Sequence, residues 1–289
     1  MRGILVCVFI GCVALSHSQG RIAYAKDDLC LFSAYITEFQ TRKDKQTGDL
    51  IAETGRFFLG KPYIAATLEN SETEHLTVNL REFDCTTLVE TCLALSLTLR
   101  DGAFAADKPL EEKFAIYCQQ LQKIRYRDGN IDGYASRLHY FTDWIYDNEK
   151  KKLVNDVTAT LGGEKIYIRT GFMSTHPDAY RQLKNNSEQI NAIRKTEEKI
   201  NLRNTSYYIS KTAIQQQASQ IKDGDIIAFL TSIQGLDVSH TGIAIWQNNK
   251  LHLLHASLTE KKVVVSHQPL AVYASTVGRF TGILVVRAI

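Results

Sequence analysis

The sequence lacks the features that mark several broad classes of protein. It has no basic tract of the kind that binds nucleic acid, and its formal net charge over 289 residues is only +3, so its composition indicates no nucleic-acid partner. It shows no internal repeat and no low-complexity tract. After Leu15 it has no apolar run long enough to cross a membrane. These absences leave a globular chain with one large domain, or with a core and an elaborating subdomain.

The first residues carry the pattern of an export signal. Arg2 gives a positive start, Ile4 to Leu15 is almost wholly apolar, and Ala23-Tyr24-Ala25 is a small–x–small cleavage site. Lipid attachment at Cys12 is a poorer alternative, because apolar residues continue beyond that cysteine. We therefore expect residues 1–25 to be a signal peptide. The mature chain would be exported, either periplasmic or secreted, with no integral membrane segment.

Cleavage after Ala25 would leave residues 26–289 with four cysteines: Cys30, Cys85, Cys92 and Cys118. Cys85 and Cys92 lie about two turns apart on one predicted helix, too far to bridge each other. If a disulfide forms in an oxidising compartment, Cys30–Cys118 is the expected pair. The alternative is that the remaining cysteines are buried free thiols.

Helical patterns dominate the first half of the chain and strand patterns dominate its last seventy residues. Residues 150–220 change in character, and we expect them to form an inserted helical lobe with little core of its own. Helices followed by antiparallel strands indicate an α+β fold. The predicted helices cover about 27–42, 47–58, 85–100, 109–124, 134–147 and 177–200. The predicted strands cover 226–230, 240–246, 251–257, 263–265 and 283–286.

Asp84-Cys85 places a cysteine at the first turn of an apolar helix, directly after an acidic capping residue. Backbone N–H groups at a helix N-terminus carry a partial positive charge, which favours thiolate over thiol. A structural cysteine is more often found in mid-helix, as Cys92 is. Cys85 is therefore a candidate nucleophile, which needs a base within hydrogen-bond reach.

Two histidines are the candidates for that base and for the group that orients it. His240 begins a strand on which it shares a face with Gly242, and His255 lies near the end of the next strand. A hairpin folded across residues 247–250 would bring His255 roughly opposite His240, at a Cβ separation of about 4.5–5.5 Å. The sequence thus predicts a Cys85, His240 and His255 site.

The same residue types are also zinc ligands, so a metal site built from Cys85, His240, His255 and Asp84 is the rival hypothesis. Asp84 is better used as a helix cap, however, and the chain offers no second close pair of cysteines or histidines at metal-ligand spacing. We therefore expect no metal and no cofactor.

Taken together, these motifs resemble a known superfamily. Asp84-Cys85, the Gly224-Asp225 turn, His240-Thr241-Gly242-Ile243 and His255-Ala256 are similar to the papain-like NlpC superfamily of cell-wall cysteine peptidases and amidases. That superfamily usually has Ser-Gly after the cysteine, whereas Thr86-Thr87 follow here.

Thr86-Thr87 after the cysteine, together with three further motifs, is similar to a narrower branch of this superfamily. Those motifs are Leu59-Gly60-Lys61-Pro62-Tyr63, Ser136-Arg137-Leu138-His139-Tyr140 and Ser239-His240-Thr241-Gly242. The branch is the N-acetylmuramoyl-L-alanine amidase-like family, formerly a domain of unknown function. The resemblance implies a papain-like fold over 26–289, with a helical N-terminal half packed on a C-terminal antiparallel sheet or half-barrel.

The resemblance also implies an activity and a partner. Cys85 would attack an amide carbonyl of peptidoglycan or a muropeptide, most simply the bond between N-acetylmuramic acid and L-alanine. His240 would protonate the leaving amine, and His255 would hold the ring of His240. Two alternatives stay open: an endopeptidase that cuts the stem peptide after D-glutamate, and a non-catalytic cell-wall binding module.

Two further residues are candidates for substrate binding. The guanidinium of Arg137 could hold a substrate carboxylate bidentately, and the alternative is a solvated charge or a structural ion pair. Tyr63, next to Pro62 in a turn, could line a sugar or peptide subsite, and the alternative is a packing role.

Overall fold

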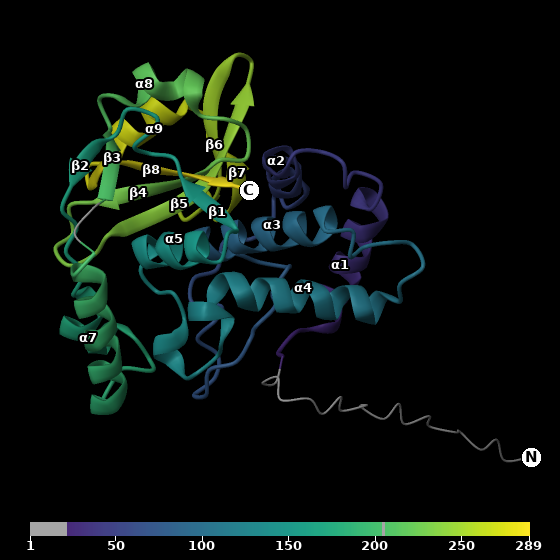
Figure 1. Cartoon of the computed structure of the whole chain (residues 1–289), viewed down its shortest axis with the longest axis horizontal. Coiled ribbons are helices and arrows are strands. Elements are labelled where there is room, and N and C mark those ends of the chain that lie inside the picture. The colour runs from purple at the N-terminus through teal and green to yellow at the C-terminus, as the bar shows by residue number, and fades with distance from the viewer. Residues whose placement is uncertain (1–21, 204–205) are drawn as a thin grey trace, which may run out of the picture.

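The computed structural model describes residues 22–203 and 206–289. Its first half is helical and lies to one side of a sheet formed mostly by the second half (Figure 1). The predicted α+β class is confirmed. The main helices are α1 (Lys26–Phe39), α2 (Thr47–Phe57), α3 (Cys85–Arg100), α4 (Leu110–Arg125) and α5 (Phe141–Lys150).

The sheet is antiparallel throughout its described pairings. Its order is β2-β3-β8-β4-β5-β6-β7, and β1 also pairs with β8. All five predicted strands are present. They are β4 (Ile226–Thr231), β5 (Val238–Gln247), β6 (Lys250–Ser257), β7 (Lys262–Val265) and β8 (Phe280–Ala288).

The two faces of the sheet are covered by different helices. On one face, Ile243, Ile245 and Leu254 join the large core that contains the buried side of α3. On the other face, Leu253 and Ala244 pack in a second core with residues of α8 (Ile214–Gln217) and α9 (Leu270–Thr276). In Figure 1, α8 and α9 lie above the sheet and α3, α4 and α5 below it. Alternate residues of each strand therefore enter different cores.

The segment 150–220 is only partly helical. It contains α6 (Phe172–Thr175) and α7 (Ser187–Asn201), but also β1 (Val154–Asp156), β2 (Glu164–Ile166) and β3 (Ser206–Ser210). Since β1 and β3 both pair with β8, this segment extends the main sheet. Its helical part shares a small core with Tyr134 and Tyr140, which precede the segment. The other members of this core are Met173, Leu183, Ile193 and Ile200.

Two predicted helices begin later than expected. The helix predicted over 177–200 begins at Ser187, because the Asn186 side chain accepts a hydrogen bond from the backbone N–H of Gln189 and caps it there. The helix predicted over 134–147 begins at Phe141, and residues 134–136 form a separate 3₁₀ turn.

Only the last residues of the predicted signal peptide, from Ile22 to Ala25, lie in the described part of the structure. Helix α1 begins at Lys26, directly after the expected cleavage site, although Ala23 makes backbone hydrogen bonds to Leu76 and Val78 that cleavage would remove. The remainder of the export pattern lies outside the described residues. Among the residues described, no helix is long and apolar enough to span a membrane.

The cysteines of the described chain are all free thiols, so the Cys30–Cys118 disulfide is not formed. Cys30 lies on the exposed side of α1, whereas Cys118 is buried on α4. Cys92 and Cys118 are therefore buried free thiols, as the alternative predicted, whereas Cys30 is a free thiol on the surface.

A buried ion pair ties the loop before α3 to the helical half. The Arg125 side chain donates from Nε to Glu90 at 2.6 Å and from Nη1 to the Thr77 carbonyl at 2.7 Å. Both charged side chains are 3% exposed. Removal of one partner would leave the other charge buried without compensation.

We predict that Arg125→Ala lowers the free energy of unfolding by about 3–5 kcal/mol. Urea-induced unfolding measures the loss. The matched control is Lys150→Ala, which removes an ion pair with Asp128 whose partners are both more than half exposed, and which should lower stability far less because water screens an exposed pair. Equal losses in the two variants would contradict the prediction.

Candidate active site

Cys85 is the first residue of α3, and the residue before it caps the helix as the sequence predicted. The Asp84 carboxylate accepts a hydrogen bond from the Thr87 backbone N–H at 2.7 Å, and the Thr87 hydroxyl accepts one from the Asp84 N–H at 3.0 Å. This reciprocal capping box fixes the first turn of the helix. It also gives a structural reason for threonine at a position where glycine is usual in the superfamily that the sequence resembles.

The environment of Cys85 keeps its thiol protonated at rest. Burial and the adjacent Asp84 charge raise the pKa of the Cys85 thiol, while hydrogen bonds from Thr241 act in the opposite direction. The helix terminus alone favours a thiolate, but here the loss of contact with water outweighs it. A base must therefore take the proton when the thiol reacts.

The two predicted histidines lie together. His240 Nε2 and His255 Nδ1 are 2.7 Å apart, and the rings meet edge to face with centroids 4.9 Å apart. Tyr273 on α9, whose ring centroid is 5.2 Å from that of His255, is close enough to Cys85 for the charge of an ionised Cys85 to act on it. The structure therefore brings the start of α3 and the histidine pair to one place.

The register of the hairpin differs from the sequence prediction by two residues. Asn248 and Asn249 form a two-residue turn with positive φ, and Ile243 pairs with Leu254. The same register continued places His255 opposite Gly242, so that His240 lies on the diagonal. The prediction that His240 and His255 point to the same face of the hairpin was correct. Diagonal side chains on one face remain within reach of each other.

Gly242 makes the diagonal contact feasible. A Cβ atom at this position would lie 2.7 Å from Leu253 Cδ1 and 2.8 Å from the Leu254 carbonyl oxygen. Glycine is thus required for close pairing of β5 with β6, and it leaves no side chain between the two rings.

Both histidines are neutral in the folded protein. Burial lowers the pKa of His240 to about 3, and the charges of His255 and Arg279 contribute to this shift. Burial also lowers the pKa of His255 to about 4. Within the described residues, Nδ1 of His240 has no hydrogen-bond partner. If Nε2 of His240 donates to His255, this Nδ1 carries the free lone pair that a base requires.

Aromatic rings surround the histidine pair. Phe229 and Phe280 stack on each other with centroids 4.5 Å apart, and Phe280 lies nearly parallel to His240 at 6.3 Å. Tyr273 meets the His255 ring edge to face at 5.2 Å. Tyr273 was not predicted from the sequence. The available signal was Pro269 followed by Leu270 and Ala274 at helical spacing, which marks α9 but not its contact with the site.

Two tyrosines lie close enough to Cys85 to be affected by its charge. Burial raises the pKa of Tyr63 and of Tyr273 to about 12 each, and the negative charge that Cys85 carries when it ionises contributes to both shifts. The Tyr63 backbone is held by a 2.9 Å hydrogen bond to the Lys261 carbonyl. Tyr63 therefore lies at the predicted site, and Tyr273 is a second phenol beside it.

Arg137 has a different environment. Its Nη1 donates to Glu69 at 2.8 Å and its Nη2 donates to Glu74 at 2.9 Å, and the residue is 6% exposed. Both ends of the guanidinium fork are occupied, so it is not free to bind a substrate carboxylate. This arrangement corresponds to the alternative of a structural ion pair.

The zinc alternative is also disfavoured by the geometry. The Asp84 carboxylate bonds to Thr87, and Nε2 of His240 bonds to His255, so these donor atoms do not converge on a common point. Over residues 22–203 and 206–289, no group of three His, Cys, Asp or Glu side chains is placed to hold a metal ion.

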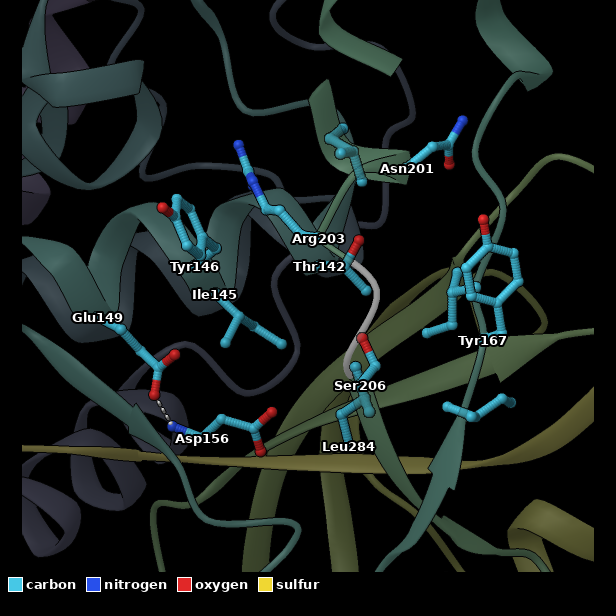
Figure 2. A pocket seen from close by; sticks show the side chains of 13 residues that line it. Thr142, Ile145, Tyr146, Glu149, Asp156, Tyr167, Asn201, Arg203, Ser206 and Leu284 are labelled. Carbon is cyan, nitrogen blue, oxygen red and sulfur yellow. Dashed lines mark hydrogen bonds between the residues drawn. The ribbon is translucent and has the colours of Figure 1, made fainter. Parts of the chain in front are cut away.

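A separate pocket, open to solvent, lies between α5, the end of α7 and β2 (Figure 2). Several of its polar groups already bond within the protein. Arg203 pairs with Asp143, the Asn201 amide bonds to Thr170, and Glu149 accepts a hydrogen bond from the Asp156 N–H. None of Cys85, His240 and His255 lines this pocket.

Comparison with known proteins shows the family of this chain. The profile of one family, described as N-acetylmuramoyl-L-alanine amidase-like, matches residues 53–281. The chain belongs to this family. The match includes Cys85 and both histidines, and no protein with a curated description matches the chain.

Solved structures support the amidase-like assignment. An N-acetylmuramoyl-L-alanine amidase from Bacteroides uniformis is 41% identical, with a TM-score of 0.78, over 84% of this chain and 99% of that one. A protein from Bacteroides fragilis, named as a xylanase, is 42% identical, with a TM-score of 0.74, over 81% and 99% of the two chains. A Legionella pneumophila protein is 26% identical, with a TM-score of 0.65, over 89% and 94%. Family and neighbours together support a cell-wall amidase-like function.

We predict that Arg137→Ala lowers stability, since it leaves the carboxylates of Glu69 and Glu74 without their partner. The expected loss in the free energy of unfolding is about 3 kcal/mol, measured with urea. The folded fraction of this variant should have the same KM for muropeptide substrates as the wild type. A raised KM with unchanged stability would instead indicate that Arg137 binds substrate.

We predict that alkylation of Cys85 by iodoacetamide rises steadily with pH to above pH 9, because the pKa of its thiol is raised from an ordinary value near 9. The rate is measured in a Cys30→Ser background, since among the four described cysteines Cys30 is the exposed one and would also react. A plateau of high reactivity between about pH 5 and 8 would instead indicate a resting thiolate–imidazolium pair.

Proposed function

We propose that this protein is a cysteine-dependent amidase that cleaves the bond between N-acetylmuramic acid and L-alanine in peptidoglycan or its fragments. The observation that carries the proposal is the 2.7 Å contact between His240 Nε2 and His255 Nδ1 beside the capped N-terminus on which Cys85 lies. A nucleophile, a base and a group that orients the base are the three parts that such catalysis needs.

The proposed reaction begins from a neutral thiol and a neutral imidazole. His240 Nδ1 takes the proton of the Cys85 thiol as the sulfur attacks the lactyl carbonyl carbon. The proton then passes from His240 to the nitrogen of L-alanine, the C–N bond breaks, and a thioester remains on Cys85. Water attacks the thioester, gives a proton to His240, and releases the carboxylic acid as the thiol forms again.

His255 acts by fixing the ring of His240. If Nε2 of His240 donates to Nδ1 of His255, then Nδ1 of His240 is kept as the acceptor that faces the reaction. As His240 becomes positively charged, the same hydrogen bond becomes charge-assisted and therefore stronger.

The oxyanion that forms on the carbonyl needs hydrogen-bond donors. The Cys85 backbone N–H at the start of α3 is one, and the phenols of Tyr63 and Tyr273 are candidates for a second. Both phenols keep their proton at neutral pH, since the pKa of each is raised to about 12. Loss of one such donor typically costs about 3 kcal/mol of transition-state stabilisation.

The proposal includes a papain-like, NlpC-type arrangement, supported by a cysteine at the start of a central helix packed on an antiparallel sheet that carries the histidines. It also includes export after cleavage following Ala25, supported by the apolar N-terminal run and by the start of α1 at Lys26. N-terminal sequencing of the protein recovered from cells tests the cleavage site.

The test of the activity is mass spectrometry of defined muropeptides incubated with the wild-type protein and with Cys85→Ala. The wild type should release intact stem peptide from the sugar, with inhibition by iodoacetamide and not by EDTA. Cys85→Ala should have no measurable turnover, and its thermal stability should stay within about 1 kcal/mol of the wild type. Cys92→Ala is the matched control, because that thiol is buried in the core away from the site.

Other outcomes select the remaining hypotheses. Cleavage within the stem, with a stub left on the glycan, would indicate the endopeptidase. Inhibition by EDTA alone would indicate a metal centre, and binding without turnover would indicate a non-catalytic module. Full activity of Cys85→Ala would remove the nucleophile assignment.

A further inference from the structure

Arg279 is a charged residue that neither the family nor the sequence motifs assign to any role. It lies in the turn between α9 and β8, where its carbonyl accepts a 2.9 Å hydrogen bond from the Ser232 N–H. Its side chain is exposed. In the part of the chain that the structure describes, its guanidinium makes no ion pair and no side-chain hydrogen bond. Arg125 and Arg137, by contrast, are already paired with buried carboxylates.

The ring of Phe280 lies between this unpaired guanidinium and His240, the proposed base. The Cζ of Arg279 is 5.8 Å from the centroid of the Phe280 ring, and that ring lies 6.3 Å from His240 at an interplanar angle of 11°. Phe280 is fixed by stacking on Phe229. The charge of Arg279 is felt by both His240 and Tyr273.

A negative charge, that of Asp84, lies on the side of the site away from Arg279. Asp84 acts on Cys85 and Tyr63, whereas Arg279 acts on His240 and Tyr273. Since His240 donates its proton to the departing amine, the peptide that leaves must lie on the His240 side. A positive charge there faces the leaving peptide rather than the acyl group held by Cys85.

We propose that Arg279 is a substrate-binding residue that holds a free carboxylate of the leaving peptide. This inference rests on the proposed amidase function. A planar guanidinium matches a carboxylate bidentately, and in an exposed turn it is accessible without displacing a partner. The substrate class is a muropeptide whose L-alanine is followed by an acidic residue with an unblocked carboxylate.

The experiment compares two substrates that differ in one group. Both are N-acetylmuramoyl-L-alanyl-D-glutamate with the γ-carboxylate blocked as a methylamide. The first has a free α-carboxylate, and in the second that carboxylate is converted to a primary amide. Each is tested with the wild type, Arg279→Gln, Arg279→Lys and the control Arg194→Gln, which changes an exposed arginine on α7. Turnover gives kcat and KM, and calorimetry with Cys85→Ala gives binding without turnover.

The wild type should prefer the carboxylate substrate by about tenfold in kcat/KM, as expected for a partly exposed charge-assisted contact, with the difference in KM. Arg279→Gln should lose this preference, Arg279→Lys should keep part of it, and Arg194→Gln should keep all of it. The calorimetric affinities of Cys85→Ala should show the same preference, and Cys85→Ala combined with Arg279→Gln should lose it.

Two results would overturn the inference while leaving the amidase proposal intact. One is an unchanged carboxylate preference in Arg279→Gln, and the other is an equal loss on both substrates. Failure of the wild type to cleave either substrate would instead count against the proposed function. In that case the calorimetric comparison still decides whether Arg279 recognises the carboxylate.

Discussion

Helix α3 is the element on which the rest of the structure depends, because it is buried on all sides. Every side chain from Thr87 to Leu99 is buried, against helices on one side and the sheet on the other. Its first turn is only partly exposed, so side chains as well as water must satisfy its first N–H groups. The capping box between Asp84 and Thr87 meets part of that need, and it also determines where Cys85 lies. The constraint that stabilises the core therefore also places the candidate nucleophile.

The same burial explains the protonation state of the site. Contact with water is reduced around Cys85, His240 and His255, which raises the pKa of the thiol and lowers the pKa of both imidazoles. All three groups are neutral at rest as a result. In this site the helix terminus and the histidine pair stabilise charge as it forms during the reaction, and do not maintain it beforehand.

The charged groups around this neutral centre are unevenly distributed. Asp84 lies on the side of the nucleophile and Arg279 on the side of the base, with aromatic rings between them. Two arginines of the helical half, Arg125 and Arg137, are held in buried ion pairs with structural roles. The distinction between a structural and a binding arginine thus depends on whether a carboxylate of the chain already occupies the guanidinium.

The sequence by itself determined the fold class, the boundaries of most helices and strands, the capped cysteine and the shared face of His240 and His255. These features follow from local periodicity and capping, which are properties of neighbouring residues. Family membership, too, was evident from short motifs around Cys85 and His240.

Only the tertiary structure decided which distant side chains meet. The two-residue turn at Asn248-Asn249 pairs Ile243 with Leu254, so His255 does not lie directly opposite His240. The sequence could not reveal this register, because the alternation of side chains repeats every two residues and is the same for both registers. Burial of Arg137 between Glu69 and Glu74, and the approach of Tyr273 and Arg279 to the histidines, depend on segments far apart in the chain. Such contacts arise from packing of whole elements, so no pattern of neighbouring residues encodes them.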